Sequence, residues 1–331
     1  MTRVGRFNLT AALAAAAVGD LVFHRLVDRL FLPQQPVGLA RVAADLGRFA
    51  FHLQGVLGLL LLITSLAVLL RRGELFPRLM RFTVGGIGLF MATLATVGIF
   101  FLPLPARFVV HLKTSHAFLS AFICLAVWRA RGPLRGKVGL TLFALPALLQ
   151  SLALFVEALR WSGGFAPELA RGGEICGLIA GALAPVLMVP EPATGRRGIA
   201  GVLVGVVTLT LLLVALVFRF DLVQMLALYG FRLDLPPLAT PGAVTYVALV
   251  IAAFVGLSMA VVWTISDPAT RLIGYGLILV GPAGCQALGP GQVLAATCGL
   301  LAIATALTRM PPAQPAPVAA APLISAEAPG L

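Results

Sequence analysis

Apolar runs of about 20 residues recur along most of this chain, and they limit its fold more than any other feature. A run of that length is what an α-helix needs to cross the hydrocarbon of a membrane. Of all residues, 60% are hydrophobic and only 11% are charged, whereas soluble domains average about 25% charged residues. One aqueous core cannot hide so much apolar surface. The sequence therefore predicts an all-α polytopic integral membrane helix bundle.

We count ten apolar segments and interpret them as about ten transmembrane helices of one domain, residues 1–309. The last two segments are separated only by "LGPGQ", so the alternative is one hairpin that does not cross fully. The tail, 310–331, is rich in Pro and Ala and is predicted to be disordered. The segments are 8–31, 50–70, 82–103, 108–128, 138–158, 174–190, 198–218, 241–264, 272–288 and 291–308.

Arginine and lysine set the predicted orientation. The net charge is +12, and a cytoplasmic N-terminus places fourteen of these cations inside and seven outside. We therefore expect a multi-pass protein of a bacterial inner (plasma) membrane with both termini cytoplasmic, and lipid rather than nucleic acid as its surroundings. The N-terminal run also resembles a secretory signal, and cleavage near Ala17 would leave nine spans.

The stretch "VGLARVAADLGRFAF" before the second segment has helical spacing of charge. Arg41, Asp45 and Arg48 form one stripe, with apolar residues around it. This pattern predicts either an interfacial helix or an outward extension of the second span.

Ionisable residues concentrate in the first span, where lipid is expected. Asp20, His24 and Asp28 are spaced i, i+4 and i+8 and form one helical stripe in the outer half of the span. A charged stripe facing lipid would cost several kcal/mol. We expect it to face other helices, a watery cavity or the outer interface.

The four histidines all map to the outer half of the predicted bundle, on the first, second and fourth spans. This predicts one outward-facing polar pocket in the N-terminal half, residues 1–160, with 174–309 as a mostly apolar scaffold. The alternative is a set of polar residues that are satisfied independently. The pocket candidates are Asp20, His24, Asp28, His52, Gln54, His111, Lys113 and His116, with Glu157 nearby.

No cofactor is demanded by these residues. His111 and His116 are five apart, about 140° around a helix, so they are poorly placed to hold one small ion together. A haem ligated by two of His24, His52 and His116 remains an alternative. The four cysteines form no CxxC pair and are predicted to be buried free thiols.

Two short stretches resemble membrane protein families. The outer histidine of the first span followed by "RRGELFPRLMR" resembles ten-span membrane acyltransferases, although "NLTAALA" replaces their early Arg-Gly pair. The stretch "FLPLPARFVVHLKTSHAFLSAF" resembles quinol-interacting subunits of the polysulfide-reductase type. Each likeness covers under about 130 residues and the two are incompatible, so the sequence assigns no family.

The sequence favours a transporter or permease of a small molecule, lipid or ion, because it lacks an enzyme signature such as GxSxG or HExxH. One alternative is a membrane enzyme or redox subunit, either an acyl or glycosyl transferase or a haem- or quinol-interacting subunit. A second alternative is a structural subunit of a larger membrane complex.

Overall fold

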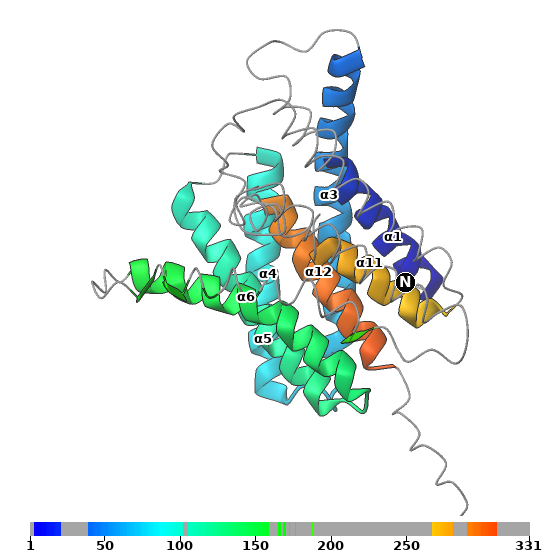
Figure 1. Cartoon of the computed structure of the whole chain (residues 1–331), viewed down its shortest axis with the longest axis vertical. Coiled ribbons are helices and arrows are strands. Elements are labelled where there is room, and N and C mark those ends of the chain that lie inside the picture. The colour runs from blue at the N-terminus through cyan, green and yellow to red at the C-terminus, as the bar shows by residue number, and fades with distance from the viewer. Residues whose placement is uncertain are drawn as a thin grey trace, which may run out of the picture.

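The computed structural model describes residues 3–20, 39–101, 105–158, 267–280 and 290–309, with a few isolated residues between 165 and 188. Within these residues the chain is helical and contains no strand (Figure 1), as the sequence predicts. The predicted segments 198–218 and 241–264 and the tail lie outside the described residues, as does most of 174–190. The helices are α1 (Arg3–Gly19), α3 (Leu39–Leu70), α4 (Arg78–Thr96), η2 (Val97–Phe101), α5 (Ala106–Arg129), α6 (Leu134–Ala158), α11 (Pro268–Val280) and α12 (Pro290–Leu307).

Four stretches are long and apolar enough to cross a membrane, and they coincide with the second to fifth predicted segments. They are Ala44–Leu70, Arg78–Phe101, Phe108–Arg129 and Leu134–Glu157. Three further apolar helical stretches are shorter: Asn8–Gly19, Pro268–Val280 and Val293–Leu307. The described part of the chain is thus helical, with four helices that have the length and composition of membrane spans.

Helix α3 begins eleven residues earlier than the predicted second span, at Leu39 rather than residue 50. The charged stripe is therefore an outward extension of this helix and not a separate interfacial helix. Arg48 and Asp45 lie on its exposed side, with Nη1 of Arg48 3.8 Å from Oδ1 of Asp45. No residue breaks the helical pattern between 39 and 50. His52 lies in the fourth turn.

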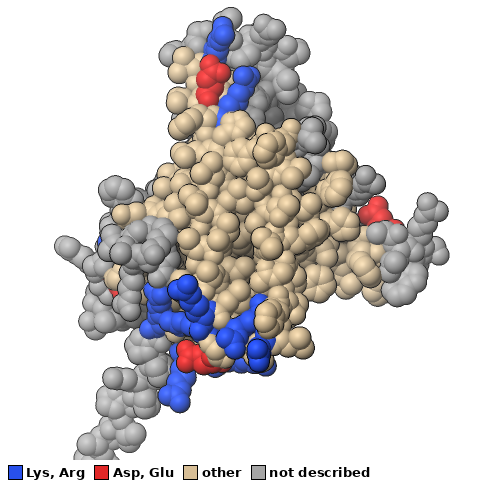
Figure 2. All heavy atoms as spheres, turned by 180° about the vertical axis from the view of Figure 1, so that it is seen from behind, with Lys and Arg blue, Asp and Glu red and all other residues tan. Residues whose placement is uncertain are grey.

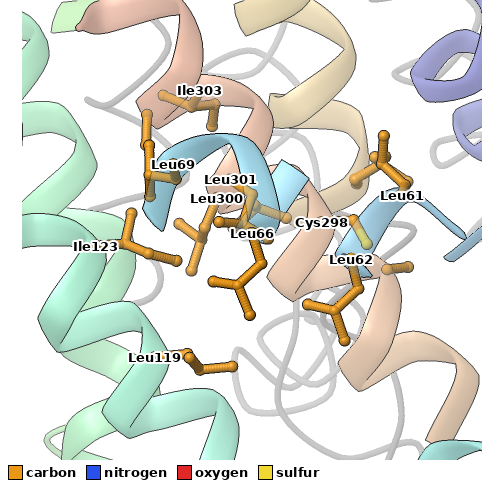
Figure 3. Packing of buried hydrophobic residues seen from close by; sticks show 14 of the residues in the cluster. Leu61, Leu62, Leu66, Leu69, Leu119, Ile123, Cys298, Leu300, Leu301 and Ile303 are labelled. Atoms are coloured by element: carbon orange, nitrogen blue, oxygen red, sulfur yellow. The ribbon is translucent and has the colours of Figure 1, made fainter. Parts of the chain in front are cut away.

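Helix α12 occupies the centre of the described bundle. It contacts every other described helix, and nearly all of its side chains are buried. Its sequence "VLAATCGLLAIATAL" is apolar on every side, which is the pattern of a helix covered all round. Figure 3 shows leucines of α3 and Leu119 and Ile123 of α5 close to Leu300, Leu301 and Ile303 of α12.

The neighbours of α12 form two antiparallel hairpins. In the α3–α4 pair, Gly55 meets Ile99 at one end and Gly88 meets Leu66 further along. In the α5–α6 pair, Ser151 donates to the carbonyl of Lys113 (3.2 Å), and the thiol of Cys124 lies 3.8 Å from the carbonyl of Leu140.

Helix α12 runs parallel to α3. Gln54 contacts Gly291 near the start of α12, and Arg72 contacts Thr308 just beyond its end. The two helices therefore finish at the same end of the bundle, where the turns that follow α3 and α5 also lie.

The surface between the two ends is apolar. Large hydrophobic side chains of α3 to α6 are exposed along it, and Figure 2 shows uncharged atoms between charged residues at the two extremities. Along α3, Arg48 and Arg71 bound this band. At a rise of about 1.5 Å per residue they are about 35 Å apart, against about 30 Å of hydrocarbon in a bilayer. The band fits a membrane.

The cysteine prediction is confirmed for Cys124 and Cys298, which are free and buried. Cys176 is free but only half-buried, and Cys285 lies outside the described residues.

Helices α11 and α12 touch backbone to backbone, and this contact generates a prediction. A Cβ at Gly299 would lie 2.7 Å from the carbonyl oxygen of Gly276, so Gly299→Ala forces the helices apart. We expect a loss of about 1–3 kcal/mol in unfolding free energy, measured by denaturant unfolding in micelles. Gly86→Ala is the control, since no atom lies within 4 Å of its added Cβ. Equal stability of the two variants would contradict the packing.

A candidate polar site around helix α12

Gln54 is the polar side chain of α3 that reaches α12. It is fully buried, and its Nε2 donates a hydrogen bond of 3.1 Å to the carbonyl of Gly291. Its Oε1 is buried and has no hydrogen-bond partner among the residues that the structure describes. A buried acceptor left without a donor costs about 1–3 kcal/mol. Packing alone does not account for an unpaired amide oxygen within the apolar band.

The seam between α3 and α12 is close because of small residues. The side chain of Leu294 packs against the backbone of Gly58, where an added Cβ would lie 2.8 Å from it. The carbonyl of Gly58 is also 3.2 Å from the thiol sulfur of Cys298. These contacts fix the position of Gln54 against the first turn of α12.

The first turn of α12 lies inside the apolar band. The helix begins at Pro290, a residue favoured at the first position of a helix. It starts level with Gln54, six residues beyond Arg48 along α3, which is a depth of about 9 Å. A helix N-terminus carries partial positive charge, so the amide of Gln54 and this N-terminus form one polar spot in apolar surroundings.

His116 is the second polar contact with α12. Its Nδ1 lies 2.7 Å from Oγ1 of Thr297. The Thr297 hydroxyl donates to the carbonyl of Val293 (2.8 Å) and lies 3.6 Å from Sδ of Met91. Because the hydroxyl proton is used by the stronger carbonyl acceptor, we assign the ring proton to Nδ1, and Nε2 is then the basic nitrogen.

Most other hydroxyls of the bundle bond within their own helix. Thr114, Ser115 and Ser120 each donate to the carbonyl four residues earlier. Such groups need no partner from another helix. Gln54 and His116 differ from them, because their side chains contact another helix, α12.

Of the predicted stripe in the first span, the structure describes Asp20 alone; His24 and Asp28 lie outside the described residues. Asp20 is buried at the end of α1. The preceding residue, Gly19, packs on Ala50 of α3. Ala50 is one helical turn before Gln54 in α3. Helix α1 therefore ends, just before Asp20, one turn of α3 away from Gln54.

His52 lies on the exposed side of α3. Its ring meets Phe51 edge-on, with centroids 5.4 Å apart, and stacks with Phe100 at 6.4 Å and 23°. Phe100 belongs to the π-helical turn η2, a geometry often found at functional sites. The ring of His52 thus contacts aromatic side chains, whereas the side chain of Gln54 contacts α12.

His111 and His116 lie on different sides of α5, since His111 is exposed and His116 contacts α12. Lys113 is half-buried, and its carbonyl is used by Ser151. Glu157 is exposed near the end of α6. Of the predicted pocket, the structure thus brings Gln54 and His116 to one helix, at Gly291 and Thr297. These two positions are about 9 Å apart along α12.

No group of three or more His, Cys, Asp or Glu side chains among the described residues could hold a metal ion. Of the residues predicted as haem ligands, His52 stacks on Phe100 and His116 bonds to Thr297, so their rings have different neighbours. Haem ligation remains a prediction.

The sequence reasoning missed the partners on α12. Thr297 stands alone in an apolar run, and nothing in the pattern marks it as the partner of a histidine 181 residues away. Gly291 did carry a signal, because Pro290 and Gly291 follow the Gly- and Pro-rich stretch before α12. That signal places a helix start but does not place it beside Gln54.

Comparison of the chain with protein-family models, with curated proteins and with solved structures found no match. Its function is therefore argued from the geometry of its own residues.

The bond between His116 and Thr297 can be tested by removing one hydroxyl. Hydrogen bonds between membrane helices contribute about 0.6 kcal/mol on average and up to about 1.7 kcal/mol. We expect Thr297→Val to lower the unfolding free energy by an amount in this range, measured by unfolding in micelles. Thr83→Val is the matched control, since that exposed hydroxyl donates only to Leu79 of its own helix. The bond contributes nothing if Thr297→Val is as stable as the control.

Proposed function

We propose that the chain is a single transmembrane domain, residues 1–309, of about ten spans with both termini cytoplasmic in an inner membrane. The four described spans and the apolar band support membrane insertion. The orientation is inferred from the excess of arginine and lysine at one end. That end is formed by the turns after α3 and α5 (Figure 2).

We propose further that this membrane protein is a transporter or permease of a small polar molecule. The observation that supports this most is the unpartnered Oε1 of Gln54 at a helix that starts inside the apolar band. Helices that begin or break within the membrane, with their N-termini at the substrate, are a recurrent feature of transporter sites.

The chemistry of the two polar contacts indicates the kind of substrate. Oε1 of Gln54 accepts a hydrogen bond, so the substrate needs an N–H or O–H donor. The positive end of α12 favours an oxygen acceptor on the same molecule. His116 lies about 9 Å deeper along α12, where Nε2 can accept a proton or hydrogen bond from the substrate as it passes.

This proposal predicts that Gln54→Leu abolishes transport without unfolding the protein. Leucine removes the acceptor that the substrate needs. It also removes the unsatisfied oxygen, which is stabilising, and the hydrogen bond to the carbonyl of Gly291, which is destabilising. Because the two effects oppose each other, we expect stability to change by less than about 1 kcal/mol. A thermal-shift panel of amino acids, organic acids, sugars and amines identifies a stabilising compound. Uptake of that compound into proteoliposomes is then measured for the parent chain and the variant.

The control for this experiment is Thr93→Val, which removes an exposed hydroxyl bonded only to Leu89 of α4. The variant should transport like the parent chain. Full transport by Gln54→Leu would overturn the role of Gln54. If no compound in the panel stabilises or crosses, the structural-subunit interpretation is favoured.

The proposed orientation is tested by cysteine labelling. Asp45 and Gly73 are both exposed, and α3 separates them across the apolar band. An impermeant maleimide should label Asp45→Cys from the periplasmic side and Gly73→Cys only after the membrane is opened. Both variants are made in a Cys176→Ser, Cys285→Ser background, which alone is the blank, since the remaining Cys124 and Cys298 are buried. Labelling of both variants from one side would contradict a spanning α3.

A further inference from the structure

The end of the bundle that holds the turns after α3 and α5 is strongly basic. Within the described segments 71–81 and 129–137, Glu74 is the sole acidic residue. Figure 2 shows the cations gathered at this end, below the apolar band. They are Arg71, Arg72, Arg78, Arg81, Arg129, Arg131, Arg135 and Lys137.

Three of these arginines surround the turn between α3 and α4. Nη1 of Arg72 donates to the Thr308 hydroxyl (3.4 Å). The guanidinium of Arg81 lies beside Gly73, where an added Cβ would be 3.8 Å from Nη1. Arg129 comes from the end of α5 and reaches Met80, the neighbour of Arg81 in the chain. The three guanidinium groups thus belong to, or lie beside, the short stretch from Arg72 to Arg81 that links α3 to α4.

Two of the three guanidinium groups have weak or missing acceptors. Nε of Arg81 is buried, and within the described segments it has no hydrogen-bond partner. Nη1 of Arg129 donates to the thioether sulfur of Met80 at 3.9 Å, and a thioether is a weak acceptor. Guanidinium groups bind phosphate strongly through paired N–H donors. Donors of this kind match the oxygens of a phosphate group.

The first turn of α4 adds to the positive potential at this place. Pro77 is its N-cap residue, and no side chain caps the helix by a hydrogen bond. Helix N-termini favour phosphate groups. The dipole of α4 and the side chain of Arg81 in its first turns therefore favour the same anion.

Apolar side chains border the cations directly. Leu79 and Phe82, in the first turns of α4, are 80% and 71% exposed. Trp128 is also exposed, with Nζ of Lys137 5.9 Å from its ring centroid, as is usual where a membrane surface meets water. A soluble phosphate would use the cations alone, whereas an amphiphile would use both surfaces.

We propose that this basic end binds an anionic phospholipid. Arg72, Arg81 and Arg129 contact the headgroup phosphate, and the acyl chains lie along Leu79 and Phe82. Basic clusters at the ends of membrane helices bind such headgroups by the same chemistry. This site is independent of the transport proposal, because it shares no residue with Gln54 or His116.

The test uses the full chain in nanodiscs of equal phosphatidylglycerol and phosphatidylcholine. Lipid that stays bound after transfer to detergent is identified by native mass spectrometry. The parent chain should retain phosphatidylglycerol over phosphatidylcholine, and 500 mM salt should reduce the preference, because exposed charges are screened. In R81Q/R129Q we expect the preference to fall at least about fivefold, because charge-assisted bonds to phosphate are lost.

The matched control is R41Q/R48Q, which removes two exposed arginines from the opposite end of α3 and should keep the preference. R81K/R129K keeps the charge but loses the planar fork, and it should show a smaller loss. The proposal is overturned by equal retention of the two lipids in the parent chain, or by an equal loss in the control. Displacement of the lipid by glycerol 3-phosphate at millimolar concentration would assign the site to a soluble phosphate instead.

Discussion

The described bundle is arranged around one helix, α12, that is apolar on every side. Because lipid and other helices cover such a helix equally well, close packing rather than hydrophobic burial holds it at the centre. Its small residues allow close contact: Gly299 meets Gly276 of α11. Gly58 of α3 leaves room for Leu294 of α12 in the same way. The two hairpins, α3–α4 and α5–α6, pack around α12. Their outward sides carry the exposed apolar band that fits a membrane.

The same constraint decides where polar groups are tolerated. Hydrocarbon offers no water to a polar side chain, so most hydroxyls of α3 to α6 bond to their own helices. Gln54 and His116 instead reach the backbone or side chain of α12. The amide of Gln54, on α3, and the ring of His116, on α5, both contact the central helix, and this is why the transport proposal is centred there.

The sequence predicted the helical class and the four long spans well, because runs of about 20 apolar residues have few other uses. It left the start of α3 open between two alternatives, since "VGLARVAADLGRFAF" has a helical pattern whether it lies flat or upright. Of the candidate site, Gln54 and His116 were identified through their polarity alone. Their partners, Gly291 and Thr297, depend on which helices become neighbours across more than 180 residues, and no local pattern encodes that.

The central place of α12 has a consequence for how the protein is made. The ribosome completes α1 and α3 to α6 long before it reaches residue 290, yet α12 touches all of them. The earlier helices must therefore leave the position of α12 unoccupied, or stay loosely associated, while the rest of the chain is synthesised. Final assembly is a late, post-insertion event, and a nascent chain that stops short of residue 290 exposes the vacant surfaces of α3 and α5 to quality-control proteases.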